Sequence, residues 1–271
     1  MGYFTGKVAL VTGAASGIGR GLCEALCAEG AVVYAADIQE EKLRELEQSV
    51  AGKGTIQGVA LDVVDASDFD RVLDRVLEEQ GRLDLIVNNA GTGVVGDFLQ
   101  IELEDIRKSI DVNLWGVIYG TKAAYRIMAM QGHGHIVNVA SSAGVMPVPM
   151  QTVYATSKHA VVGLSRSLRV EAAVYGVKVS AVLPGLVRTG FFDAAKVVGK
   201  YDYQREMNEL PIRPIAPRRA GELILDGIRA NRELISFPTS NTVILTLFRL
   251  FPRVMGWFVA KATVKSLEAD L

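Results

Sequence analysis

The chain has 271 residues, 49% of them hydrophobic, and a formal net charge of −1. This length allows one large core, and a charge near zero gives no reason to expect a nucleic acid or another polyanion as partner. The opening "MGYFTGKVALVTG" lacks the basic region, long apolar run and cleavage site of a secretory signal. We therefore expect a cytoplasmic protein in which Cys23 and Cys27 are small buried side chains without a disulfide.

Short apolar runs rich in β-branched residues alternate with longer helical patterns. Strands are expected at 7–13, 31–37, 58–63, 84–91, 135–142, 178–185 and near 234–237, and helices near 17–29, 39–50, 66–80, 102–131 and 152–175. The apolar runs are continuous, as in strands that are buried on both faces. The pattern predicts an α/β fold with a single doubly wound Rossmann-type parallel sheet and helices on both faces, in one domain over residues 1–271.

Two regions interrupt this alternation. Residues 186–217 combine Gly, Pro, paired Phe and mixed charge, which predicts a substrate-loop insertion. Residues 238–271 are apolar with spaced basic residues, and we expect a C-terminal helical extension there. The histidines show no metal-ligand pattern, so no metal is expected, and His133 and His135 in "QGHGHI" are interpreted as turn residues.

A Gly-rich segment, "TGAASGIG" at 12–19, follows the first expected strand and begins a helix. Gly13, Gly17 and Gly19 allow a tight turn and a close approach of the backbone to a ligand. The helix N-terminus then offers free N–H groups to a pyrophosphate. The spacing differs from the general G-x-G-x-x-G dinucleotide pattern, so the turn alone is a weak signal.

Asp37 ends the second expected strand, 18 residues after Gly19. A carboxylate at about this distance binds the ribose 2′-OH of NAD and repels a 2′-phosphate. Neither Ile38 nor Ser16, which flank the expected site, is basic. The sequence therefore predicts NAD as the cofactor, with a helix cap for "QEEKLRELE" as the structural alternative for Asp37.

Tyr154 and Lys158 in "VYATSKHA" stand four residues apart, and on a helix they share a face. A phenol ionises near pH ~10, and a neighbouring positive charge lowers that pKa. The pair is thus a candidate proton-transfer group. From the spacing alone, a surface tyrosine beside a solvated lysine remains open.

Together these motifs resemble the short-chain dehydrogenase/reductase family, in chains of about 250 residues, and the resemblance covers residues 5 to about 236. The residues that carry it are "TGAASGIG", "LDV" at 61–63, "NNAG" at 88–91, Asn113, Ser141, "YATSK" at 154–158 and "PGLVRT" at 184–189. The resemblance implies that Tyr154 is the general acid/base and that Lys158 lowers its pKa and binds the nicotinamide ribose. It implies that Ser141 orients the substrate oxygen and that Asn113 holds a water in a proton relay.

The resemblance also implies the cofactor contacts. Asp62 and Val63 would border the adenine and Asn89 its ribose, while Val187 and Thr189 would hold the carboxamide. The full expected set is Gly13, Ser16, Gly17, Ile18, Gly19, Asp37, Asp62, Val63, Asn89, Tyr154, Lys158, Val187 and Thr189. Ser142 is an alternative to Ser141, which is favoured because it lies 13 residues before Tyr154, the family's usual interval.

The expected pocket walls, at 92–99, 143–151 and 186–198, are rich in Val, Met, Pro and Phe. Such a lining favours a lipophilic secondary alcohol or ketone, such as a steroid-like, cyclic or acyl substrate. The structural alternative is that these residues merely pack a lid. An NADPH-dependent 3-oxoacyl or ketone reductase is the second functional hypothesis, and a non-catalytic NAD-binding sensor or scaffold is the third.

The tail at 242–265 is apolar enough to suggest a membrane span, but Arg249, Pro252 and Arg253 interrupt it. The pairs Arg249/Arg253 and Lys261/Lys265 predict a basic face opposite the apolar one. The tail either packs over the lid or a neighbouring subunit of a homo-oligomer, as C-terminal segments do in many oligomers of this family, or rests on an anionic membrane. We expect a dimer or homotetramer held by packing, with a weak peripheral membrane affinity beside it.

Overall fold

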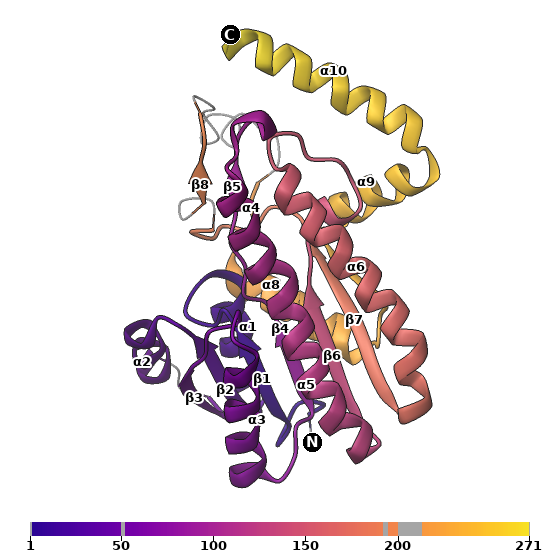
Figure 1. Ribbon diagram of the computed structural model, residues 1–271. Coiled ribbons are helices and arrows are strands. Elements are labelled where there is room, and N and C mark those ends of the chain that lie inside the picture. Colours follow the sequence, from indigo (N-terminus) through magenta and orange to yellow (C-terminus); the bar gives the residue numbers. More distant parts are fainter. Residues whose placement is uncertain (1, 50–51, 192–194, 200–212, 271) are drawn as a thin grey trace.

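A computed structural model describes residues 2–49, 52–191, 195–199 and 213–270. Figure 1 shows a twisted central sheet between two layers of helices, with one long helix extending from the end of the molecule that carries the C-terminus.

The central sheet has seven parallel strands among the described residues, in the order β3-β2-β1-β4-β6-β7-β9. They are β1 (Val8–Thr12), β2 (Val32–Asp37), β3 (Thr55–Ala60), β4 (Leu85–Asn88), β6 (Gly134–Val139), β7 (Val177–Pro184) and β9 (Leu234–Phe237). The chain winds outward in one direction from β1 and in the other from β4. This confirms the predicted doubly wound sheet and puts the switch point between β1 and β4, where such folds bind ligands.

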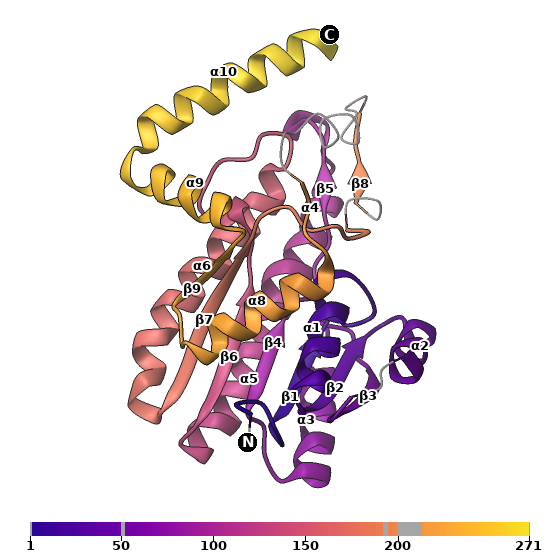
Figure 2. The ribbon, with the colours of Figure 1, turned by 180° about the vertical axis from the view of Figure 1, so that it is seen from behind.

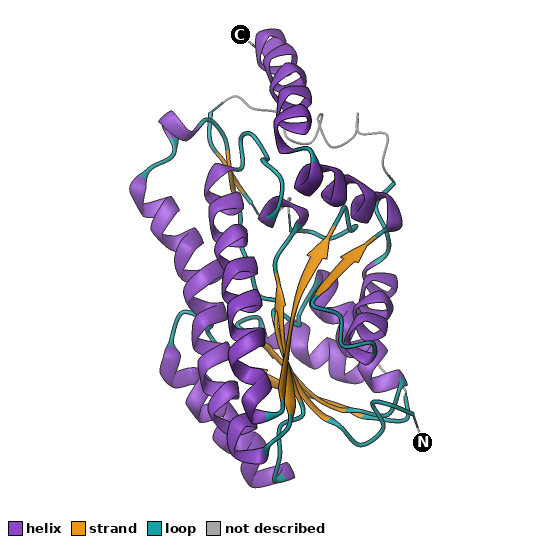
Figure 3. Cartoon of the chain, turned by 90° about the vertical axis from the view of Figure 1, so that its right-hand side faces the viewer, coloured by secondary structure: helices purple, strands orange, loops and turns teal. Residues whose placement is uncertain are grey.

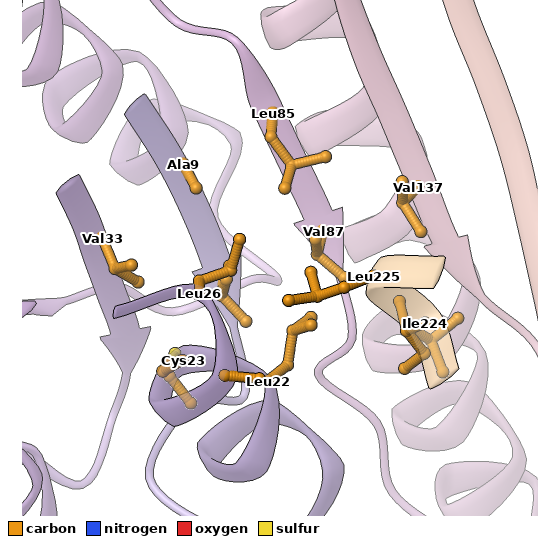
Figure 4. Close-up of a cluster of buried hydrophobic side chains, with 14 of the residues drawn as sticks. Ala9, Leu22, Cys23, Leu26, Val33, Leu85, Val87, Val137, Ile224 and Leu225 are labelled. Carbon is orange, nitrogen blue, oxygen red and sulfur yellow. The ribbon is translucent and has the colours of Figure 1, made fainter. Parts of the chain in front are cut away.

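Apolar stripes hold helices on both faces of the sheet. One face carries α1 (Gly17–Ala28), α2 (Glu40–Ser49) and α8 (Pro217–Arg229), and the other carries α3 (Ala66–Gln80), α4 (Leu103–Ile110), α5 (Gly116–Gln131) and α6 (Thr152–Ala172). Figure 4 shows the first of these layers, in which α1 and α8 meet the strands through Ala9, Leu22, Cys23, Leu26, Val33, Leu85, Val87, Val137, Ile224 and Leu225. Cys23 and Cys27 are buried and free, as predicted.

The helix predicted at 102–131 is interrupted. A π-helical turn, Asp111–Trp115, separates α4 from α5 and contains Asn113. Such a turn inserts a residue into the helical ladder and often marks a functional position. The apolar spacing continues through it, so the hydrophobic pattern alone does not reveal the break.

His135 was wrongly interpreted as a turn residue. It lies in β6, is buried, and its Nε2 is 2.8 Å from Ser180 Oγ on β7. Burial lowers the pKa of His135 to about 3. His133 does lie in the turn after α5, and the strand predicted at 58–63 is shifted to Thr55–Ala60.

A second, small sheet joins the predicted substrate loop to the body. Strand β8 (Lys196–Val197) pairs in parallel with β5 (Val94–Val95), and Lys196 Nζ is 2.7 and 2.8 Å from the two carboxylate oxygens of Asp105 on α4. Sequence analysis did not predict this sheet, because two-residue strands carry no periodicity. Residues 192–194 and 200–212 of the expected insertion lie outside the described residues.

The C-terminal extension consists of α9 (Thr239–Leu250) and α10 (Pro252–Asp270). Helix α9 buries Asn241, Leu245 and Phe248 against the body. Figure 2 shows α10 leaving the body beyond α9. Within the described residues, none of the helices is long and apolar enough to cross a membrane by itself. Thr239–Leu250 and Pro252–Lys261 reach that length and hydropathy together, but they are bent by 114°.

Candidate active site

A cavity of about 580 Å³ lies at the carboxyl ends of the central strands. Its lining includes Gly13 after β1, Asp37 at the end of β2, Asn89 after β4, Ala140 after β6 and Pro184 at the end of β7. Figure 3 shows the strand arrows pointing to this end of the molecule. The cavity therefore spans the switch point that the topology predicts as a ligand site.

The Gly-rich turn forms one wall. Gly13 and Gly17 have φ values of +65° and +53°, which side-chain-bearing residues rarely adopt. A Cβ on Gly17 would lie 3.0 Å from the Thr189 methyl group, and one on Gly19 would collide with the Gly13 carbonyl. Gly19 does not line the cavity. Because it has no Cβ, the first turn of α1 can pack against the Gly13 carbonyl.

The first turn of α1 is open toward the cavity. Ser16 occupies the N-cap position without a side-chain capping bond, and Ser16, Gly17 and Ile18 line the cavity. Uncapped N–H groups at a helix N-terminus attract an anion.

Asn89 holds this turn in place. Its Nδ2 donates to the carbonyls of Thr12 (2.9 Å) and Gly13 (3.2 Å). The Thr12 hydroxyl in turn accepts the N–H groups of Asn89 (3.0 Å) and Ala90 (3.1 Å). Asn89 lines the cavity as predicted, but its side-chain amide is bonded to the loop backbone. The Thr12 hydroxyl stabilises the same loop, and sequence analysis did not predict that role.

Asp37 lines the far end of the cavity and connects two loops. Its Oδ2 accepts the Ala15 N–H at 3.1 Å, and its Oδ1 accepts the Gln39 N–H at 3.0 Å. The bond to Gln39 fixes the turn just before α2 but is not the expected helix cap, because α2 begins at Glu40 and Asp37 accepts no N–H group from inside that helix among the described hydrogen bonds. A carboxylate has about four lone-pair sites, so acceptor capacity remains for a ligand hydroxyl.

Lys42 also lines this end of the cavity, where its Nζ donates to Gln39 Oε1 at 2.7 Å. Sequence analysis missed it, because a lysine in the first turn of a charged helix looks like an ordinary solvated residue.

Asp62 and Val63 line the cavity, as predicted. Asp62 is held after β3, where its Oδ1 accepts the Val64 N–H at 3.1 Å and its N–H donates to Asp68 Oδ2 at 3.0 Å. Val112, in the π turn, lines the cavity as well and was not predicted.

Tyr154 and Ser141 meet at the centre of the cavity wall. Burial raises the pKa of Tyr154 to about 12, against the opposing influence of its hydrogen bond with Ser141. The Tyr154 side chain is nevertheless partly accessible from the cavity, which it lines. A phenol in this position is placed for exchange of a proton with a cavity ligand.

Lys158 lies on the same face of α6, one turn after Tyr154. It is buried, its Nζ donates to the Val139 carbonyl at 2.9 Å, and that nitrogen is 5.5 Å from the centre of the Tyr154 ring. Burial lowers the pKa of Lys158 to about 8. The alternative of a solvated lysine is therefore wrong.

Ser141, rather than Ser142, lines the cavity. It is the N-cap of a short 3-10 helix, Ser142–Gly144, and its Oγ accepts the Ala143 N–H at 3.2 Å. The choice made from the 13-residue interval is consistent with this placement.

Asn113 is fully buried and does not line the cavity. Its Oδ1 accepts the Thr92 N–H at 2.8 Å, while its Nδ2 donates to the Thr92 carbonyl (2.8 Å) and to Ser109 Oγ (3.2 Å). The side chain thus clamps the backbone of Thr92, which does line the cavity. A water relay through Asn113 stays a prediction.

Val187 and Thr189 line the cavity, as predicted, and are followed by Phe191, which was not singled out. The Phe191 ring centre is 5.4 Å from that of Tyr154. Lys108 on α4 is a further lining residue that sequence analysis missed.

Two of the three expected pocket walls lie elsewhere. Among residues 92–99 and 143–151, all within the described part of the chain, Thr92 is the one that lines the cavity. Val94 packs with Ile101 and Val153, and Val145 and Met146 pack against Leu183 and its neighbours. These side chains therefore pack within the protein, and whether the two segments border a bound substrate stays a prediction.

Comparison with known proteins agrees with this geometry. The sequence profile described as short chain dehydrogenase matches residues 7–196. The chain is 38% identical over 231 residues to "Oxidoreductase UcpA" of Salmonella typhimurium, covering 82% of this chain and 88% of the relative. It is 39% identical over 185 residues to the 3-oxoacyl-acyl-carrier-protein reductase FabG of Thermotoga maritima, covering 68% and 75%.

A solved structure extends the likeness to the fold. The short chain dehydrogenase/reductase from Burkholderia phymatum in complex with NAD has a TM-score of 0.83 and 27% identity, covering 94% of this chain and 96% of that one. The chain is thus an oxidoreductase of the short-chain dehydrogenase/reductase family.

Proposed function

We propose that this oxidoreductase uses NAD to interconvert a lipophilic secondary alcohol and its ketone. The observation that carries the proposal is the set of Tyr154, Ser141 and Lys158 on the cavity wall, in which Lys158 is buried, Tyr154 and Ser141 are half-buried, and Tyr154 is hydrogen-bonded to Ser141. Such a set suits proton exchange with an alcohol oxygen.

The cavity residues fit a nicotinamide dinucleotide. Gly13 and Gly17 keep the turn tight, because a Cβ on Gly13 would lie 2.8 Å from Ala90 Cα and one on Gly17 would lie 3.0 Å from the Thr189 methyl group. The uncapped N-terminus of α1 beside this turn suits a pyrophosphate. Asp37 at the far end suits a ribose diol. When bound, the oxidised nicotinamide would accept the hydride and add a positive charge beside the phenol.

The protein residues would then manage the proton. Ser141 and Tyr154 would orient the substrate oxygen, and Tyr154 would take its proton. A base with a pKa of about 12 works poorly at neutral pH. A positive charge on Lys158 favours the phenolate and moves the Tyr154 pKa downward.

Phe191 supports a lipophilic substrate. Its ring adjoins that of Tyr154, at 5.4 Å between centres, so an apolar surface borders the place where the reacting oxygen would lie. A small hydroxy acid would instead call for an arginine or lysine clamp. Lys158, beside Tyr154, donates to the Val139 carbonyl and is held by the protein backbone.

A substrate panel tests the proposal. Steroid, cyclic, aryl and acyl secondary alcohols are incubated with the protein and NAD, and NADH formation is followed by absorbance. We expect turnover with at least one lipophilic alcohol and little with short hydroxy acids. Turnover confined to charged hydroxy acids would refute the substrate class, and any NADH formation would dismiss the sensor or scaffold hypothesis.

A second candidate is an NADPH-dependent 3-oxoacyl reductase. Lys42 offers a cation near Asp37, and the relative FabG is named for that substrate class. Steady-state kinetics with NADH and NADPH on 3-oxoacyl and simple ketone substrates separate the two candidates.

A further inference from the structure

The helices α9 and α10 present large apolar side chains to solvent around their bend. We call this set the tail surface: Leu247, Leu250, Phe251, Val254, Trp257 and Phe258, each between 38% and 65% exposed. Soluble surfaces rarely keep so many large apolar residues together without a partner. Figures 1 and 2 show from opposite sides that α10 leads away from the sheet and its helices.

The charges around the tail surface have one sign. Arg249, Arg253, Lys261 and Lys265 are basic, and the sequence has no Asp or Glu from residue 239 to 267. The rest of the chain is acidic in balance, since the formal net charge is −1. A partner that is both apolar and negatively charged is therefore favoured.

Lys261 lies beside an apolar side chain, contrary to the expectation of opposite faces. Lys261 Nζ lies 5.3 Å from the centre of the Trp257 ring. The bend puts Arg249 and Arg253 on different helices, so they do not share a helical face. Aromatic rings beside long basic side chains suit the boundary between lipid headgroups and acyl chains, where the basic heads reach the headgroups.

The body of the protein and a second copy fit this surface less well. Within the described residues, α10 packs mainly against α9. In a two-fold dimer the same patch meets itself, so basic residues would face basic residues, and the carboxylates nearest in sequence, Glu268 and Asp270, follow the whole tail surface.

We propose that the tail surface docks on an anionic lipid membrane, with both helices resting in the interface. The 114° bend and the arginines beside it, Arg249 and Arg253, oppose a crossing of the bilayer. The tail lies at the end of the molecule toward which the central strands point, which is also the cavity end, so docking would hold that end near the lipid.

Vesicle flotation of the full chain tests this. The vesicles are phosphatidylcholine with about one third phosphatidylglycerol, and pure phosphatidylcholine serves for comparison. We expect flotation with the anionic vesicles and much less with the neutral ones. Near an anionic surface each basic residue contributes about five-fold in affinity, so Arg253→Gln with Lys261→Gln should weaken binding about 25-fold.

An apolar variant and a matched control complete the test. Trp257→Glu with Phe258→Glu should reduce binding at least ten-fold. Met130→Glu alters an 86% exposed apolar residue near the end of α5, and should bind like the parent. Thermal unfolding and NAD binding check that each variant is folded. If the Trp257→Glu, Phe258→Glu variant does not fold, the variant with Leu250→Ser and Val254→Ser takes its place.

Three outcomes would overturn the proposal. The first is absence of flotation of the parent chain, and the second is equal flotation with neutral and anionic vesicles. The third is a lower molar mass of the apolar variant in light scattering with unchanged flotation, which would assign the surface to a second copy. The readouts do not depend on turnover, so they are separate from the proposed oxidoreductase reaction.

Discussion

At the scale of single residues, Ser141, Tyr154 and Lys158 lie together on one wall of the cavity. The four-residue interval from Tyr154 to Lys158 left a solvated surface pair open, and it was the family resemblance, with its 13-residue interval from Ser141 to Tyr154, that singled these side chains out. Lys42 and Lys108 escaped because nothing in their local sequence separates them from solvated helix residues. Their place in the cavity depends on how α2 and α4 pack, which is tertiary information.

Cofactor choice depends on Asp37. We expect Asp37→Ala to shift the NAD to NADP preference ten- to a hundred-fold toward NADP, because about 1.5–3 kcal/mol of charged hydrogen bonding to the diol is lost. Steady-state kinetics with both cofactors measures the shift. In the double variant with Lys42→Ala, the gain in NADP use should shrink, since the nearby cation is gone.

An unchanged cofactor ratio in Asp37→Ala would mean that Asp37 serves only the loops that it bridges. Asp37→Asn is the matched control, because it retains an acceptor for the Gln39 N–H while removing the charge.

The burial of Lys158 should make the folded protein less stable. Burial lowers its pKa from 10.5 to about 8, so the unfolded chain binds this proton more tightly. The cost is fully present below about pH 8 and fades as the pH rises toward 10. We expect Lys158→Met to raise the free energy of unfolding by about 1–3 kcal/mol at pH 7 while abolishing turnover.

Denaturant unfolding at pH 7 and pH 9.5 measures this effect, and the gap between parent and variant should narrow at the higher pH. Lys178→Met, at an exposed position on β7, is the control and should show no such gap. A Lys158→Met protein that is less stable than the parent at pH 7 would contradict the account.

At the scale of elements, apolar runs predicted the central strands well, since strands buried on both faces leave a continuous signal. The failures have physical causes. His135 joins β6 because parallel pairing with Leu85 and Lys178 extends the strand up to its Gly-rich start. Strands β5 and β8 are too short for any pattern, and the π turn leaves the apolar spacing of its helix intact.

The π turn yields an element-level prediction. Asn113→Ala leaves the N–H and carbonyl of Thr92 without their partner. An unpaired buried polar group costs about 1–3 kcal/mol. Because Thr92 is half-buried and lines the cavity, we expect a loss toward the lower end of that range together with weaker NAD binding. Thermal unfolding and calorimetric titration measure the two effects. Lost turnover with unchanged stability would instead favour the proton relay.

At the scale of the whole molecule, the alternation of apolar runs and helical patterns predicted the doubly wound sheet and the resemblance supplied residues that line the cavity, but neither showed what the tail contacts. Helix α9 belongs to the core through Leu245 and Phe248, so a truncation before it would damage folding. Among the α10 side chains that the structure describes, at 252–261 and 263, none is buried. The hydropathy of α10 does not identify the partner that covers it. Assembly into a dimer or tetramer stays a prediction, which light scattering of the parent chain measures.

The central claim is that Tyr154 exchanges the proton in an NAD-dependent reaction. The most direct test compares NADH formation by the parent and by Tyr154→Phe on the best alcohol of the panel, with NAD binding measured in both. We predict a loss of at least about a thousand-fold in turnover, because proton transfer is lost and the substrate oxygen is left unpaired, with NAD affinity nearly unchanged. A variant that keeps more than about a tenth of parental turnover would contradict the account.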